Sequence, residues 1–187
     1  SFEASNKNFK YLKIFYNKIN KKYKTEIILE NAALGKDSRE VTFNQTYDGS
    51  SSTFNKININ SKYYLKKIKF LGLNKKEKYY DEEKIRLSTL DSYLVQNKIS
   101  KIDLLKIDTE GFEYEVLLGG KNSLNKISLI LFEHHYDDMI LKGYKFSDIN
   151  SFLVNNNFKQ IFKSKMPFRK SFEYIYINKS NLWKLQF

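Results

Sequence analysis

Short apolar runs alternate along this chain with segments in which apolar residues recur every three or four positions. The clearest runs extend from Ile102 to Ile107 and from Ser128 to Phe132. Helical spacing follows both runs, from Phe112 to Leu118 after the first and beyond Ser147 and Asp148 after the second. Runs of this length are typical of buried strands, and the longer spacing is typical of helices with one buried face. The alternation predicts an α/β domain whose mostly parallel sheet carries helices on both faces.

The two ends of the chain extend this pattern. Ser1 to Glu3 is expected to be the end of a strand, and a helix is expected to begin at Asn6 or Asn8. Near the other end, Phe158 to Lys163 and Phe172 to Ile177 predict an antiparallel hairpin. The other expected elements are a strand from Thr25 to Leu29, an outer strand from Val41 to Phe43, a loop or insertion over residues 44–60, a strand from Lys84 to Leu87 and a helix capped by Ser88 or Thr89.

Polar residues stand where several of the expected strands end. They are Glu3, Asn31, Asp108, Glu110, Glu133 and His134. The carboxyl ends of parallel strands meet at one edge of a sheet, and ligands of open α/β sheets bind outside that edge. These positions therefore predict a crevice whose chemistry is supplied by acids and by a histidine.

Each of these residues also has a simpler explanation. Asp108 or Thr109 could cap a helix, with Glu110 in its first turn. Successive residues of a strand point to opposite sides, so at most one of His134 and His135 faces the crevice. Either histidine could also be an ordinary, partly exposed residue. A further alternative is a divalent cation held by Asp108, Glu110, Glu133 and His134, but their spacing is not that of a tight ligand set and no metal is expected.

The composition narrows the choice of partners and compartment. The formal net charge is +12, yet almost all of the positive charge is lysine, with arginine only at Arg39, Arg86 and Arg169. Arginine's forked donors dominate base and phosphate recognition, so a nucleic-acid partner is not expected. The absence of cysteine favours the cytoplasm, and the longest apolar run is far shorter than the ~20 residues of a membrane span. With no linker in the sequence, residues 1–187 are expected to form one domain.

The segment from Ile102 to Glu113 resembles the signature of FkbM-type methyltransferases, in which a hydrophobic strand ends in Asp-x-Glu-Gly-x-Glu. The similarity continues through Val116 to Gly120 and into Leu129 to Glu133, which resembles the next strand of that family. Upstream, Leu87 to Leu94 is similar to the helix that leads into the motif, and Asn31 to Gly35 is similar to the segment after the third strand.

This resemblance implies a Rossmann-like, class I methyltransferase that uses S-adenosylmethionine to methylate an oxygen, often on a sugar or natural product. Phe2-Glu3 resembles the acidic end of the second strand, so the resemblance assigns the ribose of the cofactor to Glu3 and the adenine to Asn31 and Ala32. Asp108, with Glu110, would face the methyl group and a small-molecule or glycan acceptor. His134 stands where a general base would be useful.

One part of the family pattern is missing. None of the seven glycines lies in a strand–turn–helix setting ahead of Glu3, where the family has its glycine-rich cofactor turn. We therefore expect an N-terminally truncated methyltransferase that lacks the first strand and is inactive alone. The alternatives are a non-catalytic Rossmann-like binding or assembly module that has lost the turn, and an enzyme with a nucleotide cofactor. The acceptor is expected to bind near the weakly matching region from Asn44 to Glu83.

Overall fold

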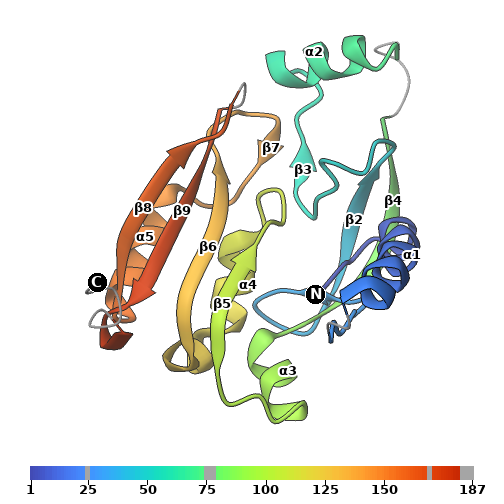
Figure 1. The fold of residues 1–187 in the computed structure, drawn as a ribbon. Helices are drawn as coiled ribbons and strands as arrows, with labels where there is room; N and C mark the ends of the chain where they lie inside the picture. Colours follow the sequence, from blue (N-terminus) through green and yellow to red (C-terminus); the bar gives the residue numbers. More distant parts are fainter. Residues whose placement is uncertain (24–25, 74–78, 168–169, 182–187) are drawn as a thin grey trace.

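The computed structural model describes residues 1–23, 26–73, 79–167 and 170–181. Helices and strands alternate along the chain, and the strands form several small sheets (Figure 1). In chain order the elements are α1 (Asn6–Tyr23), β1 (Ala33–Leu34), β2 (Glu40–Thr46), β3 (Lys56–Ile57), α2 (Lys62–Phe70), β4 (Tyr80–Ser88), α3 (Leu90–Gln96), β5 (Ile102–Ile107), α4 (Glu113–Gly119), the 3-10 helix η1 (Lys121–Lys126), β6 (Ile127–His135), β7 (Ile140–Leu141), α5 (Phe146–Asn155), β8 (Phe158–Lys165) and β9 (Ser171–Asn178).

The largest sheet of the described residues has the strand order β5-β6-β9-β8. β5 and β6 are parallel, with Leu105 opposite Ile130, whereas β9 is antiparallel to both of its neighbours. Helices α4 and α5 lie against one face of this sheet (Figure 1). The core on that face includes Leu117, Phe132 and Ile149, which are fully buried, so this layer removes much apolar surface from water.

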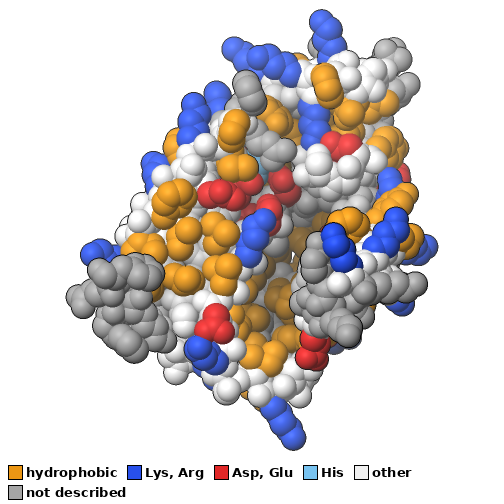
Figure 2. Space-filling view, viewed as in Figure 1, with side chains coloured by type: hydrophobic (Ala, Val, Ile, Leu, Met, Phe, Trp, Pro, Cys, Tyr) orange, Lys and Arg blue, Asp and Glu red, His pale blue; other side chains and the backbone are white. Residues whose placement is uncertain are grey.

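The opposite face of the same sheet is open. It is turned toward the viewer in Figure 1, and no helix of the described residues crosses it in that view. Leu104 on β5 is 51% exposed and Phe162 on β8 is 48% exposed, while Leu129 and Leu131 on β6 are half-buried. Figure 2 shows apolar side chains gathered over this face. The expected second layer of helices is therefore absent from the described residues.

Two smaller sheets lie beside the large one. β1, β4 and β2 form a three-stranded sheet, and β3 pairs with β7. A second core joins α2, β3 and β7 through the buried residues Ile57, Tyr64, Ile68, Tyr79, Met139 and Ile140. This packing holds the segment between β2 and β4 near the carboxyl ends of β5 and β6 (Figure 1).

Several expectations about the strands are wrong. The pairing is not mostly parallel, because β2–β4, β3–β7, β6–β9 and β8–β9 are antiparallel, and only β1–β4 and β5–β6 are parallel strand pairs in the described ranges. Residues 26–29 form no strand, and Thr25 lies outside the described residues. This region instead contributes a single parallel bridge between Phe2 and Glu30. Ile28 is 59% exposed, so its side chain adds no buried contact that would favour a longer strand here.

Other expectations are confirmed. β5 extends over the expected residues Ile102–Ile107, the side chain of Thr89 caps α3, and β8 and β9 form the expected hairpin. The expected loop over residues 44–60, however, contains the end of β2 and all of β3. No helix found within the described ranges combines the length and the apolar character needed to cross a bilayer.

Candidate functional site

The turn after β5 projects acidic side chains from the carboxyl end of the sheet. β5 ends at the buried Ile107, and α4 begins only at Glu113. Glu110 and Gly111 both have positive φ angles, +49° and +93°, which a non-glycine residue rarely adopts. A Cβ at Gly111 would lie 2.8 Å from the Ile140 Cγ2 atom, so only glycine fits there. The helix-start explanation of Asp108 and Glu110 is wrong, because the N-cap of α4 is Phe112 and Glu110 lies ahead of the first turn.

The buried carboxylate of Glu113 holds this turn. Its Oε1 atom accepts hydrogen bonds from the backbone nitrogens of Thr109 (3.3 Å) and Gly111 (3.0 Å) and from the Thr109 hydroxyl (3.1 Å). Its Oε2 atom accepts a hydrogen bond from the Tyr144 hydroxyl at 2.5 Å. Glu113 is 1% exposed, and these donors satisfy a charge that would otherwise be costly to bury. Glu113 is thus the structural member of the acidic motif.

The segment between β2 and β3 clamps the same turn from the other side. The Thr53 hydroxyl donates to the backbone oxygen of Glu110, and the side-chain amide of Asn55 donates to that of Gly111, each at 2.7 Å. These bonds hold the two residues with positive φ in place. The region expected to bind the acceptor therefore contacts the acidic motif directly.

β6 brings a second acid and a histidine to this place. The strand continues past the expected end at Phe132 to His135. The His135 Nε2 atom lies 3.3 Å from Glu110 Oε2 and 3.5 Å from Glu133 Oε1, and its Nδ1 atom lies 3.6 Å from Asp137 Oδ2. The His135 Nε2 and Glu133 Oε1 atoms are buried without a hydrogen-bond partner in the described part of the chain.

Burial and the charges of neighbouring groups shift the pKa values of Glu110 and His135. Burial raises the pKa of Glu110 to about 7, with opposition from His135 and reinforcement from the neighbouring carboxylates. Burial alone would lower the pKa of His135, but Asp137, Glu110 and Glu133 outweigh it and raise that pKa. A carboxyl group that titrates near neutrality is suited to proton transfer.

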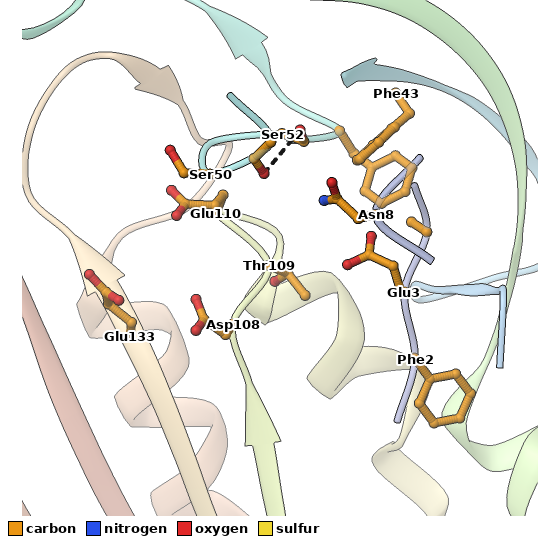
Figure 3. A pocket seen from close by; sticks show the side chains of 13 residues that line it. Phe2, Glu3, Asn8, Phe43, Ser50, Ser52, Asp108, Thr109, Glu110 and Glu133 are labelled. Carbon is orange, nitrogen blue, oxygen red and sulfur yellow. Dashed lines mark hydrogen bonds between the residues drawn. The ribbon is translucent and has the colours of Figure 1, made fainter. Parts of the chain in front are cut away.

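Asp108, Glu110 and Glu133 line one pocket of ≈350 Å³ together with Glu3. Figure 3 shows Asp108 and Glu110 in the turn after β5 and Glu133 on β6, with Glu3 and Asn8 across the pocket on the N-terminal segment. The lining residues are Phe2, Glu3, Ala4, Asn8, Phe43, Gly49, Ser50, Ser52, Phe54, Asp108, Thr109, Glu110 and Glu133. The expected crevice thus joins acids that are more than a hundred residues apart in the sequence.

The other expected cofactor residues lie around Glu3. The Glu3 Oε1 atom accepts a hydrogen bond from Ser5 N at 2.8 Å, and burial raises the Glu3 pKa. The Asn31 side chain donates to the backbone oxygen of Glu3 at 3.0 Å and does not line the pocket. Ala32 lines an adjoining pocket of ≈480 Å³ that shares Asp108 with the first. Of the four residues expected to bind the cofactor, Glu3, Ala32 and Asp108 therefore line one or both of these pockets, and Asn31 lines neither.

The structure places His134 away from this site, which corrects its expected position. Its ring contacts those of Tyr136, Tyr144 and Phe146 on the helix-covered face of β6. Burial lowers its pKa to about 4, so this histidine is neutral at ordinary pH. The alternative cation site that included His134 does not form. In the parts of the chain that are described, no group of three or more His, Cys, Asp or Glu side chains is arranged to hold a metal ion.

Sequence reasoning missed His135, although a signal for it was present. Residues two apart on a strand share a face. If Glu133 on β6 points to the crevice, His135 must point to the same side. Expecting His134 in the crevice is therefore inconsistent with expecting Glu133 there. Asn8, Ser50 and Ser52 were missed because no pattern in the sequence connects them with the acidic motif.

Comparison with known proteins identifies a family for this chain. No curated protein and no solved structure matches this chain. The family model of the methyltransferase FkbM domain matches residues 1–160 of the 187. The matched span includes Glu3, the turn after β5 and all of β6. The chain therefore belongs to the FkbM methyltransferase family.

Proposed function

We propose that this methyltransferase uses S-adenosylmethionine to methylate a hydroxyl group of a sugar or natural product. The observation that carries the proposal is the acidic pocket, with Glu3 on one side and Asp108, Glu110 and Glu133 on the other. Ionised carboxylates accept hydrogen bonds from hydroxyl groups. The carboxylates of this pocket could therefore accept hydrogen bonds from the hydroxyl groups of a ribose on one side and of the methyl-accepting substrate on the other.

The residues near the N-terminus fit the nucleoside part of the cofactor. Glu3 offers a half-buried carboxylate for the ribose hydroxyls, and the adjoining pocket offers the apolar side chains of Phe2, Ala32 and Leu34 to the adenine. When bound, the cofactor supplies a methyl group, whose bond to sulfur breaks and leaves its electron pair on the sulfur. Asp108 would orient the acceptor hydroxyl, with its own carboxylate held by the Lys106 ammonium group 3.1 Å away.

An open groove supports the proposal that the site is completed by a further strand. Among the described residues, β5 pairs with β6 alone, and the adjoining pocket follows β5 and the turn after it from Leu104 to Thr109. The same pocket is lined by Ser1, Phe2 and residues 32–34. Backbone groups at a strand edge need partners. We infer that a strand and a glycine turn elsewhere in the complete protein fill this groove, and that the present chain alone is inactive.

The proposal is tested by calorimetry of the complete protein with S-adenosylmethionine. We expect roughly micromolar binding, and a loss of about 10- to 100-fold in Glu3→Gln, because that change removes a charged acceptor from the ribose. The matched control is Glu26→Gln, which alters an exposed acid outside the pocket and should bind like the wild type. A complete protein that binds neither this cofactor nor its demethylated product contradicts the proposal.

The acceptor side is tested separately. Tritiated S-adenosylmethionine and a panel of mono- and oligosaccharides would serve as probes. We expect Asp108→Asn to keep the affinity for the cofactor while methyl transfer falls about 10- to 1,000-fold, because the acceptor hydroxyl loses its orienting carboxylate. Undiminished transfer by a folded Asp108→Asn protein would remove Asp108 from the mechanism.

The alternative is a non-catalytic binding or assembly module. Absence of cofactor binding by the complete protein, with an intact fold, would support this alternative. For the enzyme, the lack of cysteine agrees with the cytoplasmic location that we propose.

A further inference from the structure

His135 lies behind the proposed pocket rather than in it. It does not line the pocket, yet its Nε2 atom faces Glu110 and Glu133, which both do. Its side chain is 9% exposed, and its other nitrogen faces Asp137. A buried imidazole that contacts three carboxylates is an arrangement that packing alone does not require.

We propose that His135 is a positioning residue for methyl transfer: as an imidazolium oriented by Asp137 and facing Glu133, it holds Glu110 ionised at the pocket wall, so that Glu110 takes the proton of the acceptor hydroxyl. This inference rests on the proposed function. It adds a residue that neither the acidic motif nor the family resemblance identifies.

The charges around Glu110 explain why such a residue is needed. Carboxylates crowded in one place cannot all stay ionised unless a cation compensates them. The groups whose charges act on Glu110 or His135 are Asp108 from the turn, Glu113 from α4, Glu133 from β6, Asp137 after β6, and Lys142 after β7.

Lys142 does not replace the histidine. Its ammonium group donates to the backbone oxygen of His135 at 2.6 Å, and burial lowers its pKa. In the described part of the chain, His135 is the cationic group within ion-pairing distance of both Glu110 and Glu133. The compensating charge therefore depends on one imidazole.

Glu110 suits proton removal better than Asp108 does. The Asp108 side chain is 45% exposed and already paired with Lys106, whereas the Glu110 side chain is 15% exposed and contacts His135. A base acts best when its pKa lies near the working pH, and that of Glu110 is about 7.

The proton step balances as follows. The O–H bond of the acceptor breaks, and the oxygen uses an electron pair to form the new bond to the methyl carbon. The proton goes to a carboxylate oxygen of Glu110, which becomes neutral and later releases the proton to solvent. His135 keeps its own protons throughout, so its part is to hold charge and geometry.

The test is an NMR titration of the complete protein from acid to mildly alkaline pH. It would follow the carboxyl carbon of Glu110 and the imidazole of His135, and the present chain contains only two histidines. In His135→Gln we expect the Glu110 midpoint to rise by about one to three pH units, because the opposite charge is removed. The pH below which the methyl-transfer rate falls, measured with any saccharide acceptor, should shift upward together with the Glu110 midpoint.

Asp137→Asn provides a second, milder test that keeps the imidazole. We expect the His135 midpoint to fall and the Glu110 midpoint to rise, because the imidazolium loses a stabilising partner. Asp138→Asn is the matched control, since the neighbouring Asp138 is exposed and should move neither midpoint. If His135→Gln does not fold, Asp137→Asn decides the question alone.

Two readouts keep this inference separate from the proposed function. An unmoved Glu110 midpoint in a folded His135→Gln protein, or equal shifts in Asp137→Asn and Asp138→Asn, overturns the role of His135 even if the cofactor binds. Failure of the wild type to bind S-adenosylmethionine overturns the proposed function instead, whatever the titration gives. The expected result combines shifted midpoints with unchanged cofactor affinity.

Discussion

The two faces of β6 carry neighbouring residues into very different surroundings. Ile130, Phe132 and His134 point toward α4 and α5, where each is almost completely buried. Leu131 and His135 point to the open face and the pocket side. His134 lies among aromatic rings and is kept neutral, whereas His135 lies among carboxylates and is favoured as a cation. A shift of one residue along the strand thus separates a histidine packed among aromatic rings from one that faces carboxylates.

The largest expected effect concerns packing on the covered face. Phe132 is fully buried and stacks against Tyr174 and Tyr176, so Phe132→Ala should lower the free energy of unfolding by about 3–5 kcal/mol. Its neighbour Leu131 is half-buried, and Leu131→Ala should cost only about 1 kcal/mol. Denaturant unfolding of both variants measures the contrast, and equal losses would mean that the open face is covered in solution.

The two histidines should give stability opposite dependences on pH. The pKa of His134 is about 4 in the fold and about 6.5 when unfolded, so the unfolded chain binds more protons between these values. Stability from His134 is therefore present above pH 6.5 and lost as the pH falls, up to about 3 kcal/mol. His134→Phe should remove this loss, as measured by unfolding at several pH values.

For His135 and Glu110, the dependence of stability on pH has the opposite sign. The folded pKa values of His135 and Glu110 are raised, so their contribution is present at low pH and lost as the pH rises through those values. In His135→Phe, the part of the free energy of unfolding that His135 loses as the pH rises should disappear. The loss of stability at acid pH, which comes from His134, should stay unchanged. A variant that instead altered the acid side would place His135 in surroundings like those of His134.

The smallest expected effect is at the edge of the open face. Leu104 is 51% exposed, so Leu104→Ser in the present chain should change the free energy of unfolding by less than about 1 kcal/mol. In the complete protein the same change should cost more, if a further strand fills the groove beside β5. Comparing the two proteins by denaturant unfolding measures that difference, and equal small losses would contradict the proposed strand.

The sequence was informative where the pattern was local. The six residues of β5, the cap at Thr89 and the acidic motif follow from short-range periodicity and turn chemistry. Pairing direction did not follow, because it depends on which strands meet in space, and β9 lies between β6 and β8. Likewise, nothing local connects Glu3 with Glu110 across the pocket. The error at His134 was different in kind, since the alternation along β6 already contained the answer.

The two hydrogen bonds from Thr53 and Asn55 to the turn after β5 tie two properties together. The segment that carries them also lines the pocket with Ser50, Ser52 and Phe54. Under the proposed function, a substitution that reshapes this segment for a new acceptor would also move the backbone that sets the position of Glu110. In such a protein, selectivity and reactivity cannot diverge independently during evolution, and a change of acceptor would be accompanied by compensating changes in the acidic motif.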